Sequence, residues 1–133
     1  MGRRENYERQ HKEIREVANS IKVEIKKKDI DFRKVAGELN KLAGQLNVHL
    51  KSEDKFLYPE LENNKDEKIS QTALKFDKEM RGIADIFMEF KGKYNIANKI
   101  ENDTEGFLKQ EKVILEVLFK RMEREEKELY IYI

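Results

Sequence analysis

The fold is decided by residues 31–59, which read DFRKVAGELNKLAGQLNVHLKSEDKFLYP. Apolar residues recur there at steps of three and four, which is the period of an α-helix. Asp31 is a good N-cap residue, and we expect Pro59 to end the helix. The inward face of this helix is predicted to carry Val35, Leu39, Leu42, Leu46, His49, Glu53 and Phe56.

The rest of the chain repeats this helical pattern. Similar apolar stripes run from about residue 5 to 28, from about 66 to 94, and from about 103 onward. Four amphipathic helices with short connections predict an all-α protein, an antiparallel up-down-up-down four-helix bundle. Because 133 residues is close to the commonest domain size, we expect a single domain over residues 1–133.

Composition excludes several classes of function. The 28 basic and 27 acidic residues are interleaved and give a net charge of +1, so no single-signed field attracts nucleic acid or an anionic membrane. With no Cys and no apolar run long enough for a signal peptide or a membrane span, we expect a cytoplasmic protein. No nucleophile–base pair or phosphate-binding loop is evident, so we do not expect an enzyme.

Polar residues interrupt the apolar stripes. Burying each one unpaired costs about 2–7 kcal/mol, so they must find partners. Residues of antiparallel helices lie level when they are equally far from the turn, and His11 and His49 are equally far from residue 30. The same reasoning places Met80 and Arg121 in that layer and Phe76 in the next. The sequence therefore predicts one buried polar cluster made of Tyr7, His11, His49, Glu53, Arg121 and Glu125.

Two copies of one motif carry a family resemblance. His49 and Glu53, four residues apart, lead into Leu57-Tyr58-Pro59, and Arg121 and Glu125 lead in the same way into Leu129-Tyr130. Together with His11, these residues resemble the hemerythrin-like (HHE cation-binding) domain over nearly the whole chain. The resemblance implies a four-helix bundle that holds two irons.

Carried over position by position, the resemblance implies that His11 and His49 match ligands of the first iron and that Glu53 and Glu125 match the bridging carboxylates. The three histidines of the second iron align with Phe76, Met80 and Arg121. Phe cannot bind a metal, a Met thioether is a poor ligand for such an ion, and Arg keeps its proton. We therefore expect the second iron site, and with it oxygen carriage, to be lost.

A fixed positive charge is expected to replace the missing ion. Arg121 precedes Glu125 by one turn and lies roughly across from Glu53, and its planar guanidinium suits carboxylates. We therefore expect a metal-free bundle without a cofactor, with a regulatory or protein-binding role by analogy with related bundles. The alternative is a protein that binds one iron or another divalent metal through His11, His49, Glu53 and Glu125, for iron handling or for sensing a diatomic ligand.

The end of the chain, Leu129-Tyr130-Ile131-Tyr132-Ile133, is unusually apolar. One interpretation is that it folds back over the end of the bundle that holds the cluster. The other is that it contacts another protein or a second copy of the chain, because exposed apolar patches usually mark interfaces.

Overall fold

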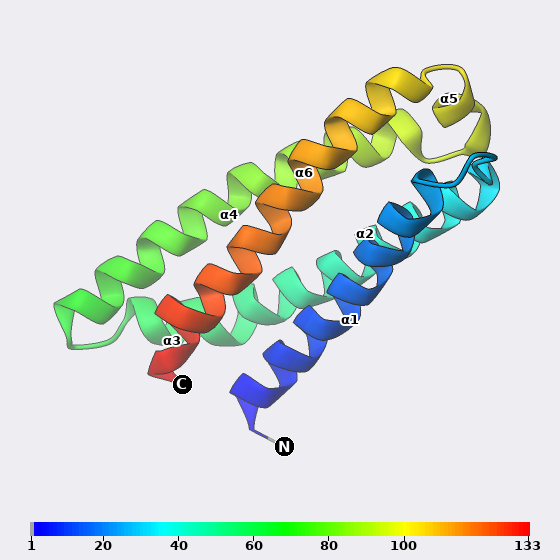
Figure 1. Ribbon diagram of the computed structural model, residues 1–133. Coiled ribbons are helices and arrows are strands. Elements are labelled where there is room, and N and C mark those ends of the chain that lie inside the picture. The colour runs from blue at the N-terminus through cyan, green and yellow to red at the C-terminus, as the bar shows by residue number, and fades with distance from the viewer. Residues whose placement is uncertain (1) are drawn as a thin grey trace.

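Four long helices form the bundle. The computed structural model describes residues 2–133, so Met1 of the predicted domain lies outside the described residues. Helices α1 (Arg3–Ile25), α2 (Phe32–Ser52), α4 (Glu67–Tyr94) and α6 (Thr104–Arg124) run antiparallel to their neighbours in the chain (Figure 1). No strand occurs within residues 2–133. The predicted all-α bundle is confirmed.

Three aspartates fix where helices begin. The side chain of Asp31 accepts a hydrogen bond from the backbone N–H of Lys34 at 3.1 Å. Asp66 and Asp103 cap α4 and α6 in the same way. These side chains satisfy N–H groups that the first turn of a helix leaves without partners. These three helices therefore begin at the aspartates from which the sequence predicted that they start.

The prediction that Pro59 ends the second helix is wrong. After α2 the chain continues through a π-helical turn, Glu53–Leu57, into α3 (Tyr58–Glu62). Pro59 lies at the start of α3, where its missing N–H removes no helical hydrogen bond. Helix α6 continues likewise through a second π-helical turn, Glu125–Leu129, into a 3-10 turn, Tyr130–Tyr132.

Each π-helical turn begins at a glutamate and shifts the inward face of the helix. The backbone N–H of Tyr58 bonds to the carbonyl of Glu53, five residues back, rather than to the carbonyl four back. In consequence Phe56, which was expected to face inward, is 52% exposed, and Leu57 is buried instead. The N–H of Tyr130 bonds to the carbonyl of Glu125 in the same manner.

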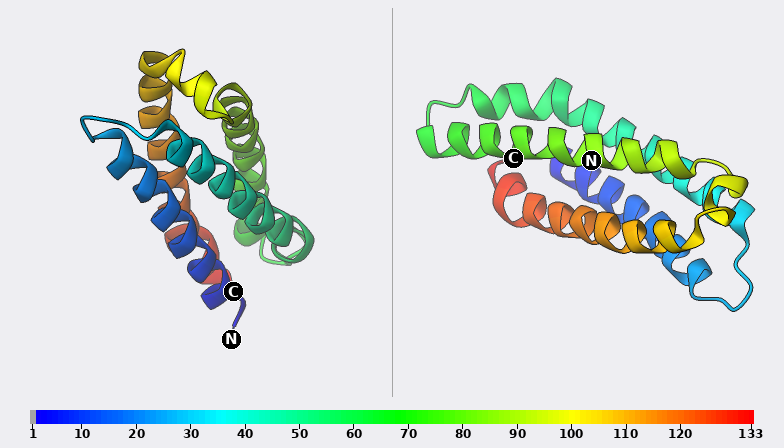
Figure 2. Two further views of the ribbon diagram at one scale, coloured as in Figure 1. Left: turned by 90° about the vertical axis from the view of Figure 1, so that its right-hand side faces the viewer. Right: turned by 90° about the horizontal axis from the view of Figure 1, so that it is seen from above.

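Both termini lie at one end of the bundle (Figures 1 and 2). A small apolar cluster at this end includes Tyr7, Phe76 and Leu129. Tyr132 and Ile133 pack partly against this cluster, so most of the apolar C-terminal segment folds onto the bundle, and Ile131 is exposed.

At the opposite end, the expected loop between the third and fourth long helices contains a short helix, α5 (Ala97–Glu101), which buries Ile100. Within residues 2–133, no helix is both long and apolar enough to span a membrane.

Candidate metal centre

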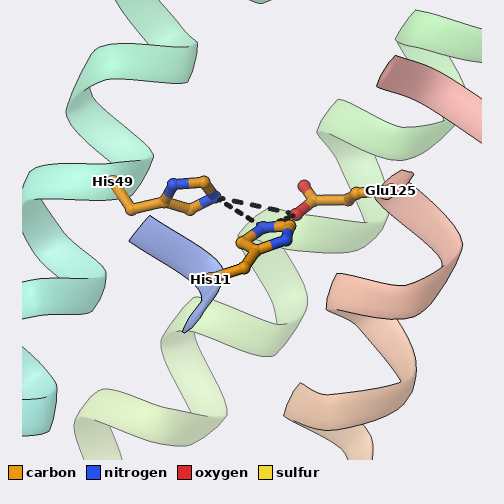
Figure 3. A group of neighbouring side chains, drawn as sticks. All are labelled: His11, His49 and Glu125. Atoms are coloured by element: carbon orange, nitrogen blue, oxygen red, sulfur yellow. Dashed lines mark hydrogen bonds and ion pairs between the residues drawn. The ribbon is translucent and has the colours of Figure 1, made fainter. Parts of the chain in front are cut away.

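Three buried side chains from three segments converge near the chain termini. His11 comes from α1, His49 from α2 and Glu125 from the turn that follows α6 (Figure 3). One potential ligand atom from each lies within 4.8 Å of the other two. The Nε2 atom of His11 is 3.1 Å from Nε2 of His49 and 2.9 Å from Oε1 of Glu125. The third separation, from Nε2 of His49 to the same carboxylate oxygen, is 3.7 Å. Donor atoms held at about 2.0–2.1 Å from one ion lie about 3–3.4 Å apart, so two separations are close to this range and a small side-chain shift would bring the third into it.

Hydrogen bonds on the outer side hold both imidazole rings in place. The Nδ1–H of His11 donates to Oε2 of Glu126 at 2.6 Å, and the Nδ1–H of His49 donates to Oε1 of Gln10 at 2.6 Å. Arg15 in turn donates to both carboxylate oxygens of Glu126. Such outward bonds fix the ring orientation and leave Nε2 free to bind a metal.

The centre of the site is rich in lone pairs. With the Nδ1 protons directed outward, the two Nε2 atoms face each other across 3.1 Å and need a positive centre between them, either a proton or a metal ion. Burial lowers the pKa of His49, which disfavours a proton on that ring. The Oε1 atom of Glu53 lies 3.3 Å from Nε2 of His49 and has no hydrogen-bond partner.

The two buried carboxyl groups are electrostatically different. Burial and the charge of Glu125 raise the pKa of Glu53 well above its usual range. Burial alone would raise the pKa of Glu125 too, but the imidazoles of His11 and His49 and the charge of Arg121 hold it below its usual range. Of the two carboxyl groups, Glu125 is therefore the one that favours the anionic form, and Glu53 is the one that favours the protonated form.

Arg121 lies on the other side of Glu125. Its Nε atom is 3.4 Å from Oε2 of Glu125, whereas Oε1 of the same carboxylate faces the histidines. The rest of the guanidinium turns away from the centre. Its Nη2 atom donates to the Tyr58 hydroxyl at 2.9 Å and to the carbonyl of Phe76 at 2.7 Å.

The expected pairing of Arg121 with both cluster glutamates is therefore only half realised. Among residues 2–133, its ion pairs are with Glu125 and Glu79, and none joins it to Glu53. The physical reason is that the Tyr58 hydroxyl and the Phe76 carbonyl already hold one arm of the guanidinium fork.

The residues aligned with the second set of histidines fill space rather than offer ligands. Phe76 and Met80 are both buried. The guanidinium carbon of Arg121 lies 4.5 Å from the centre of the Phe76 ring, within reach of a cation–π interaction. This half of the cluster thus contains a cation, an aromatic face and a thioether.

Two tyrosines enter the site without having been predicted to do so. The hydroxyl of Tyr130 donates to Oε2 of Glu53 at 2.7 Å, and Tyr58 contacts Arg121. Both were part of the quoted motif, but a helical period of 3.6 gives no reason to place them inward. Tyr7, which was predicted in the cluster, stacks on Tyr130 at 5.4 Å between ring centres and donates to the carbonyl of Ser52 at 3.4 Å.

Comparison with known proteins supports this assignment at the level of the family. Searches of the curated proteins and of the solved structures returned no significant match. Among protein families, the hemerythrin HHE cation binding domain matches residues 4–133. The helical bundle and the His–His–Glu centre agree with that match, and the chain belongs to the hemerythrin HHE cation binding domain family.

Proposed function

We propose that this chain binds one divalent transition metal ion at His11, His49 and Glu125 and does not form a two-iron centre. The supporting observation is the convergence of two Nε2 atoms and one carboxylate oxygen, with each ring held from outside by its Nδ1–H. Imidazole and carboxylate together suit Fe(II), Zn(II) or Mn(II). Bound there, the ion would supply positive charge and a Lewis-acidic centre.

The second half of the proposal concerns Arg121. Glu125 directs one oxygen at the histidines and the other at the guanidinium, and so it stands between the proposed ion and a fixed cation. Arg121 thereby takes the part that a second ion would play toward the same carboxylate. Because Phe76 and Met80 offer no suitable ligand, we include the loss of two-iron oxygen carriage in the proposal.

A metal-free network is the competing candidate. The charge of Arg121 near Glu125 and the hydrogen bond from Tyr130 to Glu53 favour it, since they already supply partners to both carboxyl groups. In that case the chain would act through its surface, in the regulatory or protein-binding role expected from the sequence. The presence or absence of a bound ion separates the two candidates.

Metal analysis of untagged protein provides the test. A histidine tag must be avoided, because its histidines would bind metal themselves and would outnumber the two histidines of the chain, both of which are in the site. Protein purified from cells grown with iron, zinc and manganese is expected to carry about one ion per chain. The apoprotein is expected to rebind it, which at 100 times Kd stabilises the fold by about 2.7 kcal/mol.

Two variants make the test specific. His49→Ala is expected to abolish binding. Glu111→Gln is the matched control, because Glu111 is also a buried glutamate but pairs with Lys22, remote in sequence from the site. If apoprotein titrated with each of the three ions binds none, and its melting temperature is indifferent to a chelator, the one-metal proposal is overturned and the metal-free network remains.

A further inference from the structure

The hydroxyl of Tyr130 contacts every polar group of the proposed metal centre. Tyr130 is completely buried and comes from the last helical turn of the chain. Its oxygen lies 3.1 Å from Nε2 of His11, 3.3 Å from Nε2 of His49 and 3.3 Å from Oε1 of Glu125. The fourth contact is the 2.7 Å hydrogen bond to Glu53.

These distances place the phenol oxygen at a corner of the site and not at its centre. The three other donor atoms are 2.9, 3.1 and 3.7 Å apart, and their separations from the phenol oxygen, 3.1–3.3 Å, fall inside that range. Four atoms separated in this way form an irregular tetrahedron. Around an ion with bonds of about 2.0–2.1 Å, tetrahedral donor atoms lie about 3.3–3.4 Å apart. An oxygen at the ion's own position would instead lie only about 2 Å from each of the three.

The matching tyrosine of the other half has a different partner. Tyr58 follows Glu53 by five residues, as Tyr130 follows Glu125, and both are reached through a π-helical turn. The hydroxyl of Tyr58 accepts from Arg121 at 2.9 Å, so a cation already holds it. Tyr130 has no arginine beside its hydroxyl among its hydrogen-bond partners within residues 2–133; it has the two imidazoles and two carboxyl groups.

From this geometry we propose that Tyr130 is the fourth ligand of the metal ion and binds it as a phenolate. The inference rests on the one-metal proposal above. As the oxygen–metal bond forms, the phenol O–H bond breaks and the proton leaves to solvent, with no change of oxidation state. One phenolate and one carboxylate then balance the two charges of the ion, while both imidazoles remain neutral. Glu53 orients the phenol from behind.

The test is a titration of the apoprotein with Zn(II), followed by the ultraviolet difference spectrum of tyrosinate and by calorimetry. Zn(II) has no absorption of its own in this range, so the spectrum reports the phenol alone. One tyrosinate and about one bound ion per chain are expected. Co(II) in place of Zn(II) is expected to give the intense ligand-field spectrum of a tetrahedral site.

Tyr130→Phe is expected to remove the tyrosinate signal and to weaken Zn(II) binding at least about 10-fold, since even residues that only orient ligands change affinity about 10–100-fold. Tyr94→Phe is the matched control and is expected to keep the signal, because Tyr94 is also buried but its hydroxyl donates to Asp103 at the opposite end of the bundle. Zn(II) binding by the unaltered chain without tyrosinate would overturn the role of Tyr130 and leave the one-metal proposal intact. Failure of the unaltered chain to bind Zn(II), Mn(II) or Fe(II) would overturn both.

Discussion

The buried cluster has two halves, one around His49 and one around Arg121, that share one sequence pattern. The first half offers electron-pair donors to a cation, whereas the second half contains a cation of its own. In each half a polar residue precedes a glutamate by four positions, a π-helical turn follows, and a tyrosine enters five positions later. Around His49 this pattern produces an electron-rich centre with two imidazoles. Around Arg121 it produces a guanidinium that lies against the Phe76 ring. The comparison shows that one sequence pattern can hold either a group of potential metal ligands or a fixed cation.

Introducing metal ligands into the half around Arg121 is expected to have the largest effect. In the triple variant Phe76→His, Met80→His, Arg121→His, three imidazoles stand where the family resemblance implies the second set of ligands. We expect the number of bound ions to rise from about one to about two per chain, measured by elemental analysis after iron loading. Arg121→His alone is expected to keep one ion. A triple variant that is folded but still binds one ion would break the comparison between the halves.

Removing the cation of the second half comes next in size. Arg121→Met leaves Glu125 buried without its fixed partner, which is expected to lower the free energy of unfolding of the apoprotein by about 3–5 kcal/mol. Arg124→Met is the matched control, because Arg124 shares Phe76 and Glu79 with Arg121 but is 40% exposed. Its change is expected to stay below about 1 kcal/mol in urea denaturation. Equal effects of the two substitutions would contradict a special role for the buried guanidinium.

Weakening the hydrogen bond that holds the His11 ring from outside is expected to have a smaller effect. Glu126→Gln replaces the carboxylate that orients His11 by a neutral amide and leaves the bundle intact. Metal affinity measured by calorimetry is expected to fall about 10–100-fold. Glu123→Gln, an exposed glutamate paired with Lys127 on the same helix, serves as the control and should leave the affinity unchanged. A drop in both variants would point to general surface charge rather than to the His11 contact.

The smallest expected effect is on the pH dependence of the unfolding free energy of the metal-free protein, which should differ between variants of Glu53 and of Glu125. Because the folded chain raises the pKa of Glu53, it holds that proton more tightly than the unfolded chain does. This contribution to stability is therefore complete below the ordinary glutamate range and is lost as the pH rises above it. Glu53→Gln should flatten the decline in unfolding free energy as the pH rises above the ordinary glutamate range, as followed by urea denaturation.

Glu125→Gln is the contrasting variant. The pKa of Glu125 is held low, so its contribution is present above the ordinary glutamate range and is lost only in acid. This substitution should therefore destabilise the apoprotein at neutral pH. Identical pH profiles for the two variants would show that the two carboxyl groups are electrostatically equivalent.

Much of the fold could be predicted from the sequence because its signals are local. The apolar period predicts each long helix, and the aspartate caps locate three of the four starts. Counting outward from the first turn predicts the level at which His11 and His49 lie, and the structure places their Nε2 atoms 3.1 Å apart. The short helix α5 was missed, since five residues carry too little periodicity to stand out from a linker.

The details of the site could not be predicted in the same way. A residue five positions after a glutamate lies about 140° round an α-helix from it, so Tyr58 and Tyr130 give no inward signal until the π-helical turns are known. The orientation of Arg121 depends on the Tyr58 hydroxyl and the Phe76 carbonyl, which belong to other segments. Gln10 and Glu126 are polar residues on helical surfaces that contain many others, and only the three-dimensional arrangement selects them.

The paired π-helical turns also change how the end of each of these helices has to be aligned with other sequences. Every side chain after Glu53 and after Glu125 is displaced by one position from the phase of the helix before it. Deleting a single residue such as Lys127 would bring the 3-10 turn Tyr130–Tyr132 back into phase with α6 and turn the side chain of Tyr130 out of the interior. In these two stretches, an insertion or deletion of one residue therefore changes which side chains face inward more than most substitutions do. An alignment of related sequences should keep the spacing of five residues between the glutamate and the tyrosine before it matches residue types.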